Sequence, residues 1–242
     1  MPGHFALILH AHLPFVRHPE HEHFLEEEWL FEAITETYIP LLRMMQRLVD
    51  DSVPFKLTMS ITPTLCAMLQ DQLLCERYVR HLDLLIDLAA RERKRNRKHP
   101  QLCELAEFYI GLFSEARRLF VDEWKCDLLS VVRELRQTGA LEIIASAATH
   151  GLLPILQQQS PRAARAQVLI GRDVVCRTFR RRTRRILVTR MRLRSRSGID
   201  SPASESPLVR CRRSRVALWN AAPMPLHLRS LLYTSRASGL RT

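Results

Sequence analysis

Two histidines, His10 and His12, stand at the end of a short apolar segment and are separated by one alanine. If that segment is a β-strand, residues two apart share one face, so both imidazoles point the same way. Such a pair suits metal ligation by neutral ring nitrogens, hydrogen bonding to a polyhydroxylated substrate such as a sugar, or general acid–base catalysis. A pair of histidines with a purely structural role is the fourth interpretation, and the spacing alone leaves all four open.

A third histidine, His150, follows another apolar segment, "LEIIAS". A metal site needs further histidines or carboxylates close by, and the polar stretch "HPEHEH" (residues 18–23) offers some. A His/Glu-rich loop of this kind is typically solvated, so it is a weak source of metal ligands.

Strands and helices determine where the histidines lie, and the hydrophobic pattern predicts an α/β fold for them. Strands are expected at 5–10, 54–63 and 141–146, and the first is expected to be buried. Helices are expected between them, with Pro40 marking a kink or a junction. Parallel strands joined by helical crossovers bring their carboxyl ends to one edge, where sites form in α/β folds. We therefore expect all three histidines to meet there.

The expected helices cover 26–48, 64–90 and 101–137, the last of these up to a cap at Thr138-Gly139. A further helix is expected to be capped by Ser160, with Pro161 in its first position.

Charge divides the 242-residue chain into two parts. Residues 1–173 hold 20 Lys and Arg against 23 Asp and Glu, a net charge of −3. Residues 174–242 hold 17 arginines and no lysine against 2 acidic residues, a net charge of +15. The run "RERKRNRKHP" (91–100) is expected to be a solvated helix end or loop in preference to a nucleic-acid-binding patch. The overall charge of +12 therefore describes the second part and predicts nothing about the first.

The remaining composition predicts a cytoplasmic protein. No apolar run approaches the ~20 residues that span a membrane, and the beginning of the chain lacks signal-peptide features. The six cysteines include no CxxC pair, which favours reduced thiols. We expect no membrane partner.

Four segments, "LHAHLPFVRHPE", "LEEEWLFEAITETYIPLL", "LTMSITPTLCAML" and "GALEIIASAATHGLLPIL", closely resemble the N-terminal part of glycoside hydrolase family 57, and within it the α-1,4-glucan branching enzyme group. The resemblance implies an incomplete seven-stranded (β/α) barrel with long helical insertions, of which residues 1–173 form a part. It implies cleavage of α-1,4-glucan with retention and transfer of the chain to form an α-1,6 branch, without cofactor or metal.

By the same resemblance, His10, His12 and His150 bind the α-glucan around the scissile glucose. Trp29 is a candidate aromatic platform for a sugar ring, with a place in the helix core as the other interpretation. The family's catalytic pair is a carboxylate nucleophile and a carboxylic acid/base about 5 Å apart.

The expected nucleophile motif, Trp-Leu-Pro-Glu, is missing, and "FRRRTRRILVTRMRLRSR" (179–196) stands in its place. Codons can be chosen for Arg185–Leu193 that, read one base later, encode Gly-Phe-Trp-Leu-Pro-Glu-Cys-Ala. We therefore hypothesise a frameshift near Val174, which makes 174–242 an out-of-frame, unstructured tail and the chain a truncated, inactive branching enzyme with no catalytic residue of its own.

Three further interpretations stay open at this point. One is an amylase or 4-α-glucanotransferase of the same family. Another is a metal-dependent hydrolase that uses His10 and His12. The third is nucleic-acid binding through the arginine-rich tail, although the tail charge by itself predicts only nonspecific binding.

Overall fold

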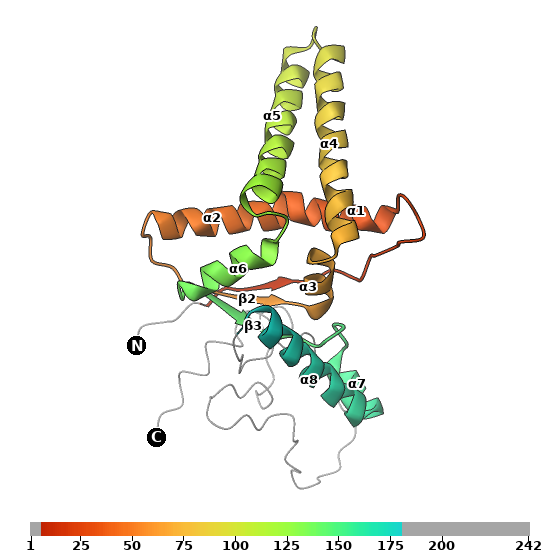
Figure 1. Cartoon of the computed structure of the whole chain (residues 1–242), viewed down its shortest axis with the longest axis vertical. Helices are drawn as coiled ribbons and strands as arrows, with labels where there is room; N and C mark the ends of the chain where they lie inside the picture. The colour runs from red at the N-terminus through yellow and green to blue at the C-terminus, as the bar shows by residue number, and fades with distance from the viewer. Residues whose placement is uncertain (1–5, 181–242) are drawn as a thin grey trace, which may run out of the picture. The chain divides into compact units, whose positions relative to one another are not determined.

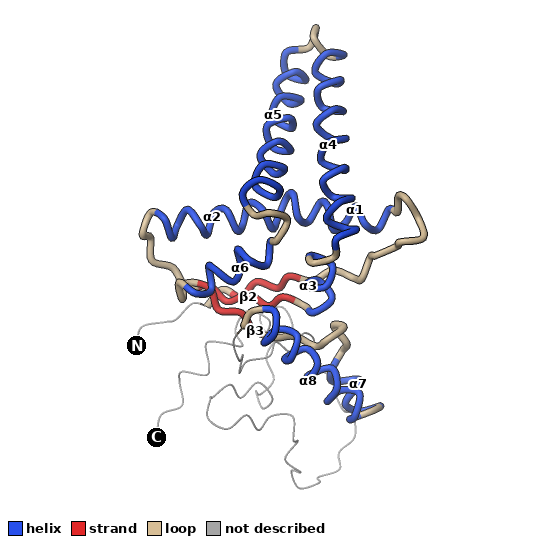
Figure 2. Tube along the Cα trace, in the orientation of Figure 1, coloured by secondary structure: helices blue, strands red, loops and turns tan. Residues whose placement is uncertain are grey.

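A computed structural model of the chain describes residues 6–180, and it contains a helix-rich α/β fold with a small parallel sheet. The sheet has the order β1-β2-β3, with strands Ile8–Ala11, Leu57–Ile61 and Leu141–Ile144 (Figure 2). Both pairings are parallel, with Ile8 opposite Thr58 and Leu57 opposite Leu141. The predicted α/β class and parallel crossovers are confirmed.

The sheet belongs to a compact unit formed, within the described residues, by 6–12, 56–63 and 141–180. Met59, Ile61, Leu141 and Ile143 are each less than 5% exposed. The prediction of a buried first strand is wrong, because β1 lies at the edge of the described sheet and its residues are only half-buried or exposed.

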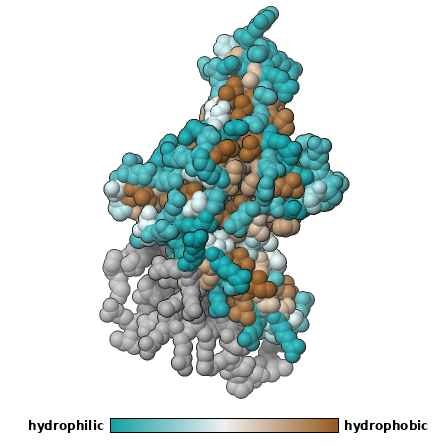
Figure 3. Space-filling view, viewed as in Figure 1, coloured by the Kyte–Doolittle hydropathy of each residue, from teal (hydrophilic) through white to brown (hydrophobic). Residues whose placement is uncertain are grey.

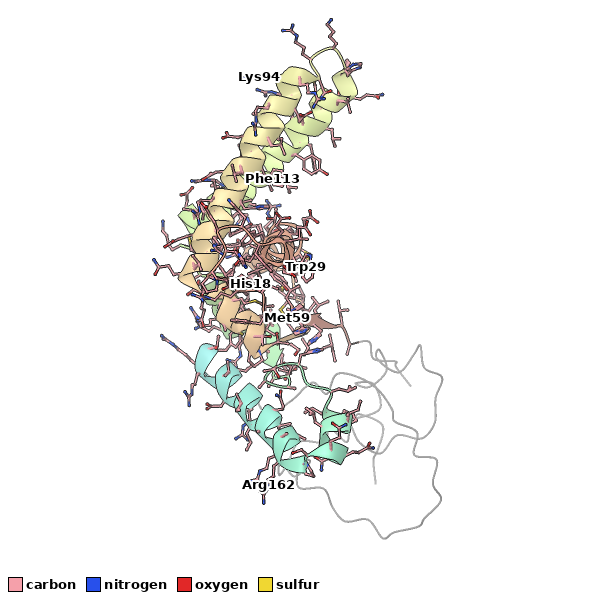
Figure 4. All side chains as sticks on the ribbon, turned by 90° about the vertical axis from the view of Figure 1, so that its right-hand side faces the viewer. His18, Trp29, Met59, Lys94, Phe113 and Arg162 are labelled. Atoms are coloured by element: carbon pink, nitrogen blue, oxygen red, sulfur yellow. The ribbon has the colours of Figure 1, made fainter. Side chains whose placement is uncertain are left out.

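Up to residue 180, two helices follow β3 in this unit, α7 (Leu153–Gln159) and α8 (Pro161–Thr178). The predicted start of α8 is confirmed: Ser160 Oγ accepts a hydrogen bond from the Ala163 N–H, and Pro161 occupies the first turn. Arg162, in the first turn of α8, is labelled in Figure 4.

The helix α8 continues past the predicted tail boundary at residue 174. It ends at Thr178, and Val175 and Phe179, one turn apart, are 1% and 4% exposed. This corrects the expectation that residues 174–178 are unstructured, because the buried face of the helix keeps its period to Phe179. The rest of the predicted disordered tail, 181–242, lies outside the described residues.

Residues 13–55 and 64–140 form a second, helical unit. Its first part is one long helical segment in which the π-helix η1 joins α1 to α2 (Figure 1). Pro40 lacks an N–H, so the preceding turn widens, and the N–H of Ile39 bonds to the carbonyl of Ile34. Pro40 therefore marks a π-helical junction. The bounds are α1 Leu25–Glu32, η1 Ala33–Tyr38 and α2 Ile39–Asp50.

The helices α4 and α5 form an antiparallel hairpin in this unit (Figure 1). The charged run 91–100 contains the exposed end of α4 and the turn into α5, as predicted; Lys94 marks this end in Figure 4. Hydrophobic side chains also reach the hairpin surface (Figure 3), including Phe108 at 63% exposure. The remaining bounds are α3 Pro63–Leu69, α4 Gln72–Arg95, α5 Pro100–Arg117, η2 Arg118–Glu123 and α6 Leu128–Gln137.

Tyr78 is at the centre of the helical unit and is fully buried. Its ring meets Phe120 edge-on at 4.8 Å between centroids, and its hydroxyl lies 2.9 Å from Thr35 Oγ1. Asp71 caps α4 by accepting a hydrogen bond from the Leu74 N–H, which separates α4 from α3 where one helix was predicted. None of the helices in residues 6–180 is long and apolar enough to cross a membrane.

Candidate functional site: a histidine cluster at the sheet edge

The structure brings the three predicted histidines together at the carboxyl edge of the sheet. His10 lies in β1, His12 directly follows it, and His150 lies in the loop after β3. The Nε2 atoms of His10 and His150 are 2.9 Å apart. The ring centroid of His150 lies 5.0 Å from that of His10 and 3.8 Å from that of His12. The parallel topology produces this cluster, because it places the ends of β1 and β3 at the same edge.

The second strand contributes a partner that the sequence motifs did not indicate. Thr62, directly after β2, is fully buried, and its Oγ1 lies 3.2 Å from Nδ1 of His12. The Thr62 N–H also donates to the carbonyl of Ala11 at 3.1 Å, which fixes the backbone between the two histidines. In the sequence, Thr62 is only a threonine at the end of an expected strand. Hydroxyl residues are common at such positions, so the sequence did not identify Thr62 as part of the site.

The surroundings of His10 and His12 favour the neutral form of both imidazoles. Burial, then the neighbouring His150 and His12, lower the pKa of His10 to about 4. Burial and His150 also lower the pKa of His12. In the contact between His10 and His150 one Nε2 carries the proton and the other accepts it. A neutral imidazole both donates and accepts a hydrogen bond, which suits it to hydroxyl groups.

The rings of the cluster stack, and this geometry does not suit a metal ion. The planes of His12 and His150 differ by 9°, and those of His10 and His150 by 26°. Nitrogen lone pairs lie in the ring plane, so the nearly parallel rings of His12 and His150 direct their lone pairs side by side and not toward one point. Within residues 6–180, no group of three or more His, Cys, Asp or Glu side chains is arranged to hold a metal.

Trp29 lies on α1 of the helical unit and is 46% exposed (Figure 4). The interpretation of Trp29 as a helix-core residue is therefore wrong. An exposed indole keeps one face available, which an aromatic platform requires.

The His/Glu-rich loop 18–23 is better anchored than its composition suggests. In the helical unit, the Arg77 guanidinium donates to the carbonyls of His18 and His21 and forms an ion pair of 2.5 Å with Glu27. Glu27 and Arg77 are only 2% and 8% exposed. Sequence reasoning missed this pair because Glu27 stands among three consecutive glutamates that look alike.

Comparison with known proteins assigns this fold to a class of carbohydrate-active proteins. The family model of "Glycosyl hydrolase family 57" matches residues 6–191, most of the chain and beyond the predicted boundary at 173. The chain belongs to glycosyl hydrolase family 57, which confirms the resemblance found in the sequence.

Individual relatives are similar over only part of their length. The 1,4-alpha-glucan branching enzyme of Thermococcus kodakarensis is 36% identical over 174 residues, which are 71% of this chain and 24% of that protein. The crystal structure of the alpha-amylase AmyC from Thermotoga maritima matches with a TM-score of 0.70 and 44% identity, over 77% of this chain and 35% of that one. A GH57-type branching enzyme from Pyrococcus horikoshii matches with a TM-score of 0.71 and 35% identity, over 77% and 34%. The chain thus spans about a quarter to a third of these relatives.

Proposed function

We propose that this chain is the N-terminal part of the catalytic domain of an α-1,4-glucan branching enzyme. Relatives named as branching enzymes support the activity, and the family match over residues 6–191 supports the domain. The small parallel sheet with its half-buried first strand is compatible with an incomplete seven-stranded barrel in which further strands pair with β1. The parent activity cleaves an α-1,4 linkage with retention and forms an α-1,6 branch.

The observation that carries the proposal is the stacked cluster of His10, His12 and His150, in which the surroundings lower the pKa of His10 and of His12. Neutral imidazoles donate and accept hydrogen bonds, as sugar hydroxyls require, and they leave the catalytic charges to carboxylates. In our proposal the cluster binds the glucose ring beside the scissile bond. Trp29, in the helical unit, is proposed separately as an apolar face for a sugar ring.

The chain itself is proposed to be inactive. Retaining hydrolysis needs a nucleophile and an acid/base, about 5 Å apart, and the sequence lacks the Trp-Leu-Pro-Glu motif that would supply the nucleophile. The alternative-frame match at Arg185–Leu193 supports a frameshift. The regular burial of α8 to Phe179 favours a change of frame after this residue and later than Val174. Nucleotide sequencing of this region tests it: an uninterrupted frame that encodes the arginines, in this and neighbouring loci, contradicts the proposal.

Binding of maltoheptaose by the full chain tests the role of the cluster. We expect calorimetry to detect binding that His10→Ala abolishes and that His23→Ala, at an exposed histidine of the loop, leaves unchanged. Equal affinity of both variants would exclude the cluster as the glucan site. Restoring the alternative frame is expected to give measurable branching, seen as new α-1,6 linkages, whereas the present chain gives none.

An α-amylase activity of the parent enzyme is the second candidate, supported by the 44% identity to the amylase structure. The restored protein would then shorten amylose without forming α-1,6 linkages, so the same product assay separates the two activities. A 4-α-glucanotransferase would instead lengthen some chains at the expense of others.

Metal-dependent hydrolysis and nucleic-acid binding have less support. A metal-dependent hydrolase needs converging nitrogens, which the stacked rings do not provide. Nucleic-acid binding rests on a tail outside the described residues, and we propose only nonspecific binding there, which salt should weaken steeply. The five cysteines of the described region form no disulfide with one another, which is compatible with the cytoplasmic location that we propose.

A further inference from the structure

The loop that carries His150 has an unusual backbone. The His150 N–H donates to the carbonyl of Ala147 at 3.2 Å, which closes a turn, and His150 has φ = 58°. Residues other than glycine are uncommon in this left-handed region, although histidine enters it more often than most. The turn therefore needs contacts from outside to keep this conformation.

Gln167 on α8 supplies those contacts with three hydrogen bonds. Its backbone carbonyl accepts from the Ala148 N–H at 3.0 Å, and its side-chain Oε1 accepts from the Thr149 N–H at 2.9 Å. Its Nε2 donates to Thr149 Oγ1 at 2.8 Å. Both polar atoms of one amide thus hold the residue that precedes His150.

Gly171, one turn further along α8, permits this close approach. A Cβ at Gly171 would lie 2.0 Å from the carbonyl oxygen of Ser146 and 3.1 Å from the nitrogen of Ala148. Only a glycine lets the helix lie directly against the backbone after β3. The backbone of residues 146–149 therefore follows the surface of α8 up to the histidine.

We propose that Gln167 is a positioning residue for His150: its side-chain amide fixes the Thr149–His150 turn so that the imidazole stacks on His12 and bonds to His10. The consequence for substrate is indirect, since Gln167 acts through His150. This inference rests on the proposed glucan-binding role of the three histidines.

The pKa of His10 distinguishes a positioning role of Gln167 from a purely structural role. His150 is one cause of the lowered pKa of His10, second to burial. If the turn relaxes and His150 leaves the cluster, the pKa of His10 rises from about 4 toward its ordinary value of 6.5.

The test compares Gln167→Leu with Gln158→Leu, a matched change at an exposed glutamine of α7, in the full chain. Histidine titration by NMR is expected to show a raised pKa of His10 only in Gln167→Leu, together with an affinity for maltoheptaose lowered by about tenfold. Gln167→Glu should retain the affinity, because a carboxylate accepts from both the N–H and the hydroxyl of Thr149. If Gln167→Leu does not fold, Thr149→Val, which removes one of the bonds, takes its place.

An unchanged His10 titration and unchanged affinity in Gln167→Leu would overturn the proposal. Failure of the proposed glucan-binding function would give a different combination of results. In that case the wild-type chain does not bind maltoheptaose, while the His10 titration still distinguishes Gln167→Leu from Gln158→Leu and supports the positioning role.

Discussion

Replacement of Gly171 by alanine tests how closely α8 packs against the end of the sheet. The new Cβ would lie 2.0 Å from the carbonyl oxygen of Ser146, and a backbone atom cannot rotate away as a side chain can. Helix and strand end must separate by roughly 1 Å or more to reach an ordinary contact distance of about 3.3 Å.

The cost follows from three contributions. Overpacking costs about 1–3 kcal/mol, and loss of the Ala148 N–H bond to the Gln167 carbonyl costs about 1 kcal/mol. The higher helix propensity of alanine offsets about 1 kcal/mol of this cost. We expect Gly171→Ala to lower the free energy of local unfolding by about 2 kcal/mol, about a 30-fold change in the opening equilibrium.

Gly111 on α5 is the matched control, because nothing lies within 4 Å of a Cβ built there. Gly111→Ala should stabilise its helix by about 0.5–1 kcal/mol through propensity alone. Amide hydrogen exchange of peptides that cover α8 and α5 measures the two effects separately. Unchanged or slower exchange in α8 of Gly171→Ala would refute the close-contact reasoning.

Three further predictions concern buried charge, pH and thiol reactivity. Glu27→Gln should destabilise the helical unit by about 3–5 kcal/mol in urea denaturation, because it leaves the guanidinium of Arg77 buried without its counter-charge. Glu20→Gln, a matched change at an exposed glutamate, should leave the urea midpoint unchanged. The pKa of His10 is about 4 in the folded protein and 6.5 ordinarily, so the unfolded chain binds more protons between these pH values and stability should rise with pH from about 4 to 6.5. Solvent screening at this partly exposed side chain limits the rise to about 1–2 kcal/mol. An equally steep rise in His10→Gln would exclude His10 as its source. Cys66 is 1% exposed, and burial raises the pKa of its thiol to about 12. Mass spectrometry should therefore find Cys66 unmodified by iodoacetamide at about pH 8 in the native protein and modified in urea. Rapid labelling of the native protein would contradict its burial.

The sequence alone determined the α/β class, the family and the edge of the sheet at which the histidines would meet. These features depend on local patterns: apolar runs for strands, helical periods between them, and histidines placed at strand ends. Ser160 and Pro161 also marked the start of α8 correctly, because a helix cap depends on neighbouring residues.

The tertiary structure decided how the site works. Stacking of His150 on His12, the bond to His10 and the resulting neutral state join residues about 140 positions apart, which no local pattern encodes. The exposure of Trp29, the buried pair of Glu27 and Arg77, and the bonds of Gln167 likewise depend on what packs against each side chain. The residue types set which chemistry was available, and packing lowered the pKa of His10 and of His12, because burial and neighbouring rings determine the cost of charge.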